Sequence, residues 1–154
     1  MRSRWTALLA VLFLAVLAPR SGDAQAGPPQ TQQRTTGNKG GLKQNFPNPF
    51  NPETTIPFTV GDYPACTNPS QRYQVSLRIY NTLVQLVAMP VLQGGSNDVA
   101  GGQRLNRLSL ACGEYRAYWD GKYLNTRREV ASGVYLYELE VDGYRMSKKM
   151  LVAK

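Results

Sequence analysis

Alternation of apolar and polar residues is the feature that most constrains how this chain can fold. Every second residue from Tyr73 to Ile79 is apolar in "YQVSLRIY", and "GVYLYELEV" (133–141) repeats the pattern with two glutamates on its other face. A period of two places one set of side chains on a buried face of a β-strand. We find no helical period after the first 26 residues, so the folded part of the chain is expected to be all-β.

Further segments of β character follow one another at short, regular intervals. Asp142-Gly143 is a strong signal for a two-residue hairpin. Pro57 indicates an edge strand, because proline cannot donate to a sheet. Seven or eight short strands predict an immunoglobulin-like antiparallel β-sandwich over residues 44–154. Besides those already named, the expected strands are 54–60, 84–92, 104–112, 114–120 and 144–154.

The stretch "NFPNPFNPETTIPF" (45–58) contains four prolines in fourteen residues. Proline fixes φ, removes a backbone donor and biases the preceding residue toward an extended conformation. We therefore expect this stretch to lie extended along an edge of the domain and to protect that edge from aggregation. It follows residues 27–43, which are dominated by Gln, Thr, Gly and Pro and are expected to form a flexible linker.

The first 26 residues have the pattern of a signal peptide. Arg2 and Arg4 precede a 13-residue apolar run, Thr6 to Ala18, which is too short to cross a bilayer. Ala24-Gln25-Ala26 fits the A-x-A cleavage pattern, so we expect cleavage after Ala26, with cleavage after Ala24 or an uncleaved anchor as the alternatives. The chain is then exported.

Two cysteines in an exported chain indicate one disulfide, between Cys66 and Cys112. The alternative is a pair of buried free thiols. A zinc site is not expected, since the sequence has no histidine and two cysteines cannot complete a tetrahedral shell.

The chain is basic, with a formal net charge of +8 that falls to +6 when residues 1–26 are removed. Lysine and arginine are scattered over the expected strands and turns, which is typical of a solvated basic surface. An exported chain has little access to nucleic acid, so an anionic cell surface is the more specific expectation.

Catalytic patterns are missing from the sequence. Without histidine there is no Ser–His or Cys–His pair, and neither G-x-S-x-G nor S-x-x-K occurs. Trp119 and the nine tyrosines are expected to pack in the core rather than to bind sugars. We therefore expect a non-enzymatic protein without a cofactor or a metal.

Three motifs in order resemble the C-terminal sorting domain (type A) of type IX secretion cargo. They are "QNFPNPFNPETTIPF", "VSLRIYNTLVQLV" and the terminal "YWDGKYLNTRREVASGVYLYELEVDGYRMSKKMLVAK". The resemblance covers residues 44–154, and the module is also similar to the immunoglobulin-like domain of flagellar hook-capping proteins. The family commonly has glycine at the turn position of Val84. Because a β-branched residue is poor at positive φ, we expect a different type of turn there.

The resemblance implies a delivery module. Its members pass through the periplasm of a Gram-negative bacterium, are recognised by an outer-membrane translocon, and lose the domain to a surface sorting peptidase. The released protein is secreted or joined to anionic lipopolysaccharide. The alternative is a free-standing immunoglobulin-like structural or adhesive protein of the cell surface. Carried over by position, the recognition residues are Pro47, Asn48, Pro49, Gly133, Val134, Tyr135, Lys148, Lys149 and Lys154.

In the last strand, alternation places Lys148 on the face of the apolar Met146 and Met150, and Lys149 on the other. A buried ammonium would be costly unless it were paired, so we expect Lys148 at a sheet edge with its amine in water. These lysines either serve as a recognition label or only protect an edge strand from aggregation.

We predict Gly27 as the N-terminus of the exported protein, because a small-residue site follows the short apolar run. N-terminal sequencing of the exported protein checks this expectation, and an intact Met1 would contradict it.

Overall fold

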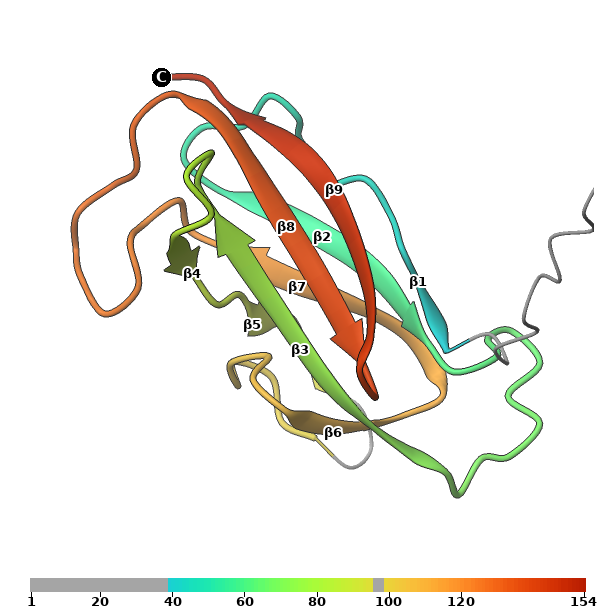
Figure 1. The fold of residues 1–154 in the computed structure, drawn as a ribbon. Helices are drawn as coiled ribbons and strands as arrows, with labels where there is room; N and C mark the ends of the chain where they lie inside the picture. Colours follow the sequence, from blue (N-terminus) through green and yellow to red (C-terminus); the bar gives the residue numbers. More distant parts are fainter. Residues whose placement is uncertain (1–38, 96–98) are drawn as a thin grey trace, which may run out of the picture. The chain divides into compact units, whose positions relative to one another are not determined.

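The computed structural model describes residues 39–95 and 99–154, and over these ranges it contains nine β-strands in two antiparallel sheets (Figure 1). The expected antiparallel β-sandwich is confirmed, with nine strands in place of seven or eight. Among the described residues there is no helix with the length and apolar character needed to span a membrane. The expected signal peptide, its cleavage site at Ala26 and residues 27–38 of the expected linker lie outside the described ranges.

Each sheet is built from segments far apart in the sequence. Sheet A has the order β1 (Gly40–Leu42), β2 (Thr54–Val60), β7 (Gly113–Trp119) and β5 (Val91–Leu92). Sheet B has the order β4 (Leu86–Ala88), β3 (Arg72–Tyr80), β8 (Gly133–Val141) and β9 (Tyr144–Val152), and β6 (Leu108–Ala111) pairs with the beginning of β3. The last strand, β9, is therefore an edge strand.

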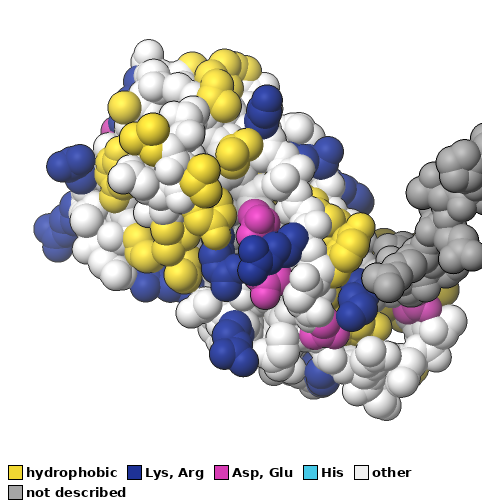
Figure 2. All heavy atoms as spheres, viewed as in Figure 1, with side chains coloured by type: hydrophobic (Ala, Val, Ile, Leu, Met, Phe, Trp, Pro, Cys, Tyr) yellow, Lys and Arg dark blue, Asp and Glu magenta, His cyan; other side chains and the backbone are white. Residues whose placement is uncertain are grey.

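The core lies between the sheets, where the alternation in the sequence places it. On β3 and β8 the inward side chains from Val75 to Ile79 and from Tyr137 to Val141 are fully buried. They face Ile56, Phe58 and Val60 of β2, which are buried as well. The outer face of sheet B is in view in Figure 2, with apolar side chains toward one end and a group of charged ones near its middle.

The two additional strands arise where local sequence signals were weak. Residues 40–42, within the expected linker, form β1, because Leu42 packs against the core and pairs with Phe58. The expected single strand 84–92 is two strands, β4 in sheet B and β5 in sheet A. The chain crosses between the sheets at Met89 and Pro90, where proline has no N–H to contribute to either sheet.

The prediction that β2 is an edge strand is wrong, because β2 lies between β1 and β7. The carbonyl of Pro57 accepts a hydrogen bond from the Lys43 N–H at 3.0 Å, so the backbone of Pro57 faces the β1 side. Regular pairing with β1 ends one residue away, at Phe58. The missing donor of Pro57 thus falls where the neighbouring strand has already ended, and an interior strand tolerates it.

The expected disulfide is confirmed, with the Cα atoms of Cys66 and Cys112 5.5 Å apart. It joins the loop after β2 to the residue before β7. For a closed loop of this length the chain-entropy model gives a stabilisation of about 4 kcal/mol.

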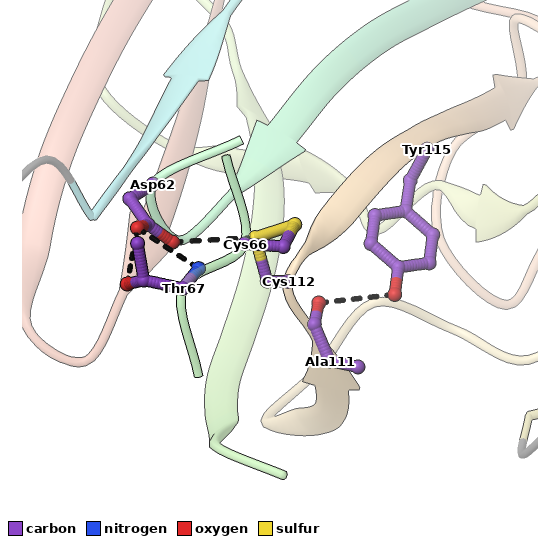
Figure 3. The surroundings of a disulfide bond; sticks show 6 residues. All are labelled: Asp62, Cys66, Thr67, Ala111, Cys112 and Tyr115. Carbon is purple, nitrogen blue, oxygen red and sulfur yellow. Dashed lines mark hydrogen bonds between the residues drawn. A yellow bond between two sulfur atoms is a disulfide. The ribbon is translucent and has the colours of Figure 1, made fainter. Parts of the chain in front are cut away.

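Asp62 lies beside the disulfide and accepts hydrogen bonds from the side chain and the backbone of Thr67, which lower the pKa of Asp62 (Figure 3). Asp62 Oδ1 is 3.6 Å from the Cys112 sulfur, a contact only, since a disulfide sulfur has no proton to donate. The bonded sulfurs are likewise not available to a metal.

The two hairpin turns of sheet B differ in how well their residues suit them. Asp142 and Gly143, with φ of 47° and 81°, form the expected two-residue hairpin between β8 and β9. Between β3 and β4, Val84 donates its N–H to the Asn81 carbonyl and has a φ of 60°. The expectation that Val84 would avoid positive φ is wrong: the left-handed position that suits glycine is kept. The Asn81 side chain, accepting hydrogen bonds from the N–H groups of Leu83 and Gln85, holds the turn in that shape.

We predict that Val84→Gly stabilises the domain by about 1 kcal/mol, because glycine removes the strain of a β-branched residue in the left-handed region. Little packing is lost, since Val84 is 70% exposed. Chemical denaturation measures the change. Thr82→Gly, two residues earlier and without positive φ, is the matched control and should be destabilising. A loss of stability in Val84→Gly would contradict this prediction.

Candidate functional site

The residues selected from the sequence meet where the proline segment, defined here as residues 44–53, lies against β9. The segment is fixed by its own buried side chains. Phe50 is 1% exposed, and its ring centroid lies 5.3 Å from that of Trp119 on β7. From β8, the hydroxyl of Tyr137 donates to the Lys43 carbonyl and accepts from the Asn45 N–H. Burial of this hydroxyl raises the pKa of Tyr137.

The proline segment bends instead of running extended as expected. The side-chain amide of Asn45, a residue only 2% exposed, donates to the Pro47 carbonyl and to Thr54 Oγ1, both at 3.0 Å. The peptide bonds before Pro47, Pro49 and Pro52 are cis. A buried amide that spans residues 45–54 therefore gives the segment a fixed curved shape.

The curved segment covers one end of the outer edge of β9. Phe50 donates its N–H to the Leu151 carbonyl at 3.0 Å, and its own carbonyl accepts from the Ala153 N–H at 3.1 Å. Asn48 Oδ1 accepts from the Leu151 N–H at 2.8 Å. The segment therefore lies along a sheet edge as expected, and that edge is one end of β9. Protection of this edge from aggregation stays a prediction.

The middle of the same edge has no hydrogen-bonded partner strand, although β1 lies close to β9. Gln44 Nε2 reaches the Lys149 carbonyl at 3.0 Å. Backbone groups of alternate residues point the same way in a strand, so those of Arg145 and Ser147 also face outward. Within residues 39–95 and 99–154 no hydrogen bond joins these outward groups to another strand.

The Gly133-Val134-Tyr135 motif lies on β8, which pairs with β9 on the side opposite the proline segment. These residues pair in register with Val152, Leu151 and Met150 of β9. The C-terminal Lys154 donates its N–H to Ser132 Oγ, and its ammonium lies 2.6 Å from Glu129 Oε2, which lowers the pKa of Glu129. The three groups of residues that the resemblance selects are therefore brought together, around residues 148–154.

Lys148 and Lys149 are exposed, and no carboxylate pairs with either of them in the described part of the chain. Lys148 shares the inward face with Met150, which is 2% exposed, but its side chain lies in water at the sheet edge as expected. The two lysines thus present two free positive charges beside the covered edge.

Gly121 lies against the proline segment, although it is not among the recognition residues that the resemblance implies. A Cβ atom on Gly121 would lie 2.1 Å from the Pro52 carbonyl oxygen, and the residue has a φ of 71°. Any side chain at this position would displace the proline segment. This contact joins residues about 70 positions apart, so no local pattern in the sequence indicates it.

A second, separate feature is a hollow of about 390 Å³ beside β4 and the 120–127 loop. Its wall includes Tyr118, whose hydrogen bond to Glu53 raises the pKa of Tyr118 to about 12. Trp119 also borders it but is only 3% exposed and donates its indole N–H to the Lys122 carbonyl, so the expectation that Trp119 packs in the core is confirmed.

Comparisons with known proteins add little to this description. No protein-family profile matches the chain, and no curated protein matches it. Among solved structures, an alkylpurine DNA glycosylase AlkC of Pseudomonas fluorescens, bound to DNA containing an abasic site analog, is similar with 16% identity and a TM-score of 0.44. The alignment covers 75% of this chain and 31% of the glycosylase chain. A similarity at this level carries no argument about function.

We predict that Asn48→Ala costs about 1 kcal/mol of stability and speeds amide exchange at Leu151, because that N–H loses its acceptor. Hydrogen exchange followed by NMR measures both effects. Asn68→Ala, an exposed asparagine in the loop after β2, is the control and should leave Leu151 unchanged. Equal rates of amide exchange at Leu151 in both variants would contradict the conclusion that the Asn48 side chain covers this part of the β9 edge.

Proposed function

We propose that residues 40–154 form a non-enzymatic sorting module that directs export across the outer membrane of a Gram-negative bacterium to the cell surface. The observation that supports it best is that the three groups of recognition residues, far apart in the sequence, meet around residues 148–154. In this proposal the type IX translocon binds that region and the surface sorting peptidase acts after export.

The geometry suits a receptor that has to distinguish a folded domain from an unfolded one. Leu151 is held from one side by Val134 of β8 and from the other by Asn48 and Phe50. This arrangement exists only when both ends of the domain have folded. A receptor that binds Lys148 and Lys149 together with the adjoining proline segment would therefore select completed molecules.

The basic charge of the chain supports a second contact, with anionic lipopolysaccharide, and export leaves no role for nucleic acid. The alternative function, a free-standing structural or adhesive surface protein, is favoured by one observation. Several large apolar side chains are exposed on sheet B, as in proteins that bind another surface directly.

The test is export of the full chain in a host with type IX machinery. We expect Lys148→Gln/Lys149→Gln to lower the amount of protein at the cell surface about tenfold, because two free charges are removed from the recognised region. Thermal stability should be unchanged, since both side chains are exposed and unpaired.

Arg104→Gln/Arg107→Gln is the matched control, with the same loss of charge on exposed residues outside the proline segment and β9. This control should be exported normally. Normal export of the lysine variant would refute recognition through these lysines. Protein that reaches the surface in a strain without the translocon would support the free-standing alternative.

A further inference from the structure

The outer face of sheet B has an exposed apolar patch at the end where β3 and β4 are connected. Its most exposed members are Leu83 and Val84 in the β3–β4 turn, at 76% and 70%. Leu86, Val134 and Leu151 are exposed by 42%, 45% and 39%. We call these five residues, with the half-buried Leu136, the apolar patch.

Strand register shows that the patch is continuous. Val134 of β8 pairs with Leu151 of β9. Tyr80 of β3 pairs with Leu136 on one side and with Leu86 on the other, which connects β8 to the β3–β4 turn. In Figure 2, apolar side chains gather toward one end of this face.

The fold does not explain the most exposed part of the patch. The side chain of Val84 does not pack in the core, and a φ of 60° is unfavourable for a β-branched residue. The turn is held by the side chain of Asn81, so it does not depend on aliphatic residues at its tip. Strain kept at an exposed site indicates a contact outside the domain.

The free charges next to the patch are positive. Lys149 pairs in register with Leu136 and shares its outward face. Arg127 belongs to the loop that contains Leu124. The Leu124 N–H donates to the carbonyl of Val87, which follows Leu86 on β4, so this loop lies beside the patch. Neither cation has an ion-pair partner among the described residues.

The carboxylates of the same face are already neutralised. Arg78 and Arg145 both contact Glu140, at 3.0 and 3.2 Å, and Arg145 lies 3.9 Å from Glu138. These acidic residues follow Leu136 along β8 and pair with Arg78 and Ser76 of β3, farther from the β3–β4 turn. A ligand over the patch therefore meets apolar side chains and unpaired cations.

We propose that the apolar patch docks on the surface of an anionic lipid bilayer. Leu83 and Val84 insert between the headgroups, and Lys149 and Arg127 contact headgroup phosphates. A protein partner suits these observations less well, because centres of protein interfaces are enriched in aromatic residues and arginine and depleted in lysine. This docking is independent of the translocon.

The test uses the exported chain and vesicles of defined lipid. Co-sedimentation compares vesicles of phosphatidylcholine alone with vesicles of phosphatidylcholine and phosphatidylglycerol in equal amounts. We expect binding to the anionic vesicles that weakens with added salt, and little binding to the neutral ones.

Leu83→Ser/Val84→Gly should reduce the binding to anionic vesicles at least about tenfold, since two aliphatic side chains no longer insert. Unfolding would not account for that loss, because Val84→Gly is expected to stabilise the turn. Tyr144→Ser, which removes a residue of 46% exposure at the other end of β9, is the matched control and should bind like the unchanged chain.

Absence of binding to anionic vesicles, or equal binding by the double variant, would overturn the proposal. So would a concentration-dependent dimer that the double variant abolishes, because the patch would then be an interface between two copies. Sedimentation velocity measures the oligomeric state. The sorting proposal is tested separately, by the export of the Lys148→Gln/Lys149→Gln variant in cells.

Discussion

The position of Phe50 is the interaction on which the rest of the structure depends. Its side chain is buried against Trp119 in the core, while its backbone is hydrogen-bonded to Leu151 and Ala153 at the end of β9. One residue thereby joins the beginning of the domain to its last strand. Gly121 has to lack a side chain so that the proline segment can reach this position.

Local patterns predicted those parts of the fold that local physics decides. The alternation in β3 and β8 predicted the buried face, Asp142-Gly143 predicted the last hairpin, and two cysteines in a chain expected to be exported predicted the disulfide. The failures arise where distant contacts override local preference. Pro57 is tolerated inside a sheet because β1 ends beside it, and Val84 keeps positive φ because Asn81 holds the turn.

The sequence indicated which residues belong to the candidate site, but it did not indicate that they lie close together in the fold. Composition and resemblance selected the proline motif, Gly133-Val134-Tyr135 and the terminal lysines, and no local signal showed that they meet. Their meeting depends on the pairing of β8 with β9 and on hydrogen bonds that span 103 residues, as from Leu151 to Asn48. Alternation placed Lys148 on the apolar face of β9, and only the cost of burying an unpaired ammonium indicated that its amine would lie in water.

The bridge between Phe50 and Val152 is parallel, which determines how the domain would respond to mechanical force. When a chain is pulled at its two ends, parallel pairing between an early segment and the last strand is loaded in shear. The hydrogen bonds of Leu151 and Ala153 then resist together rather than opening one after another. The antiparallel pairing of β1 with β2 would open first under such a force, and the junction between the proline segment and β9 would then hold the tension until it failed.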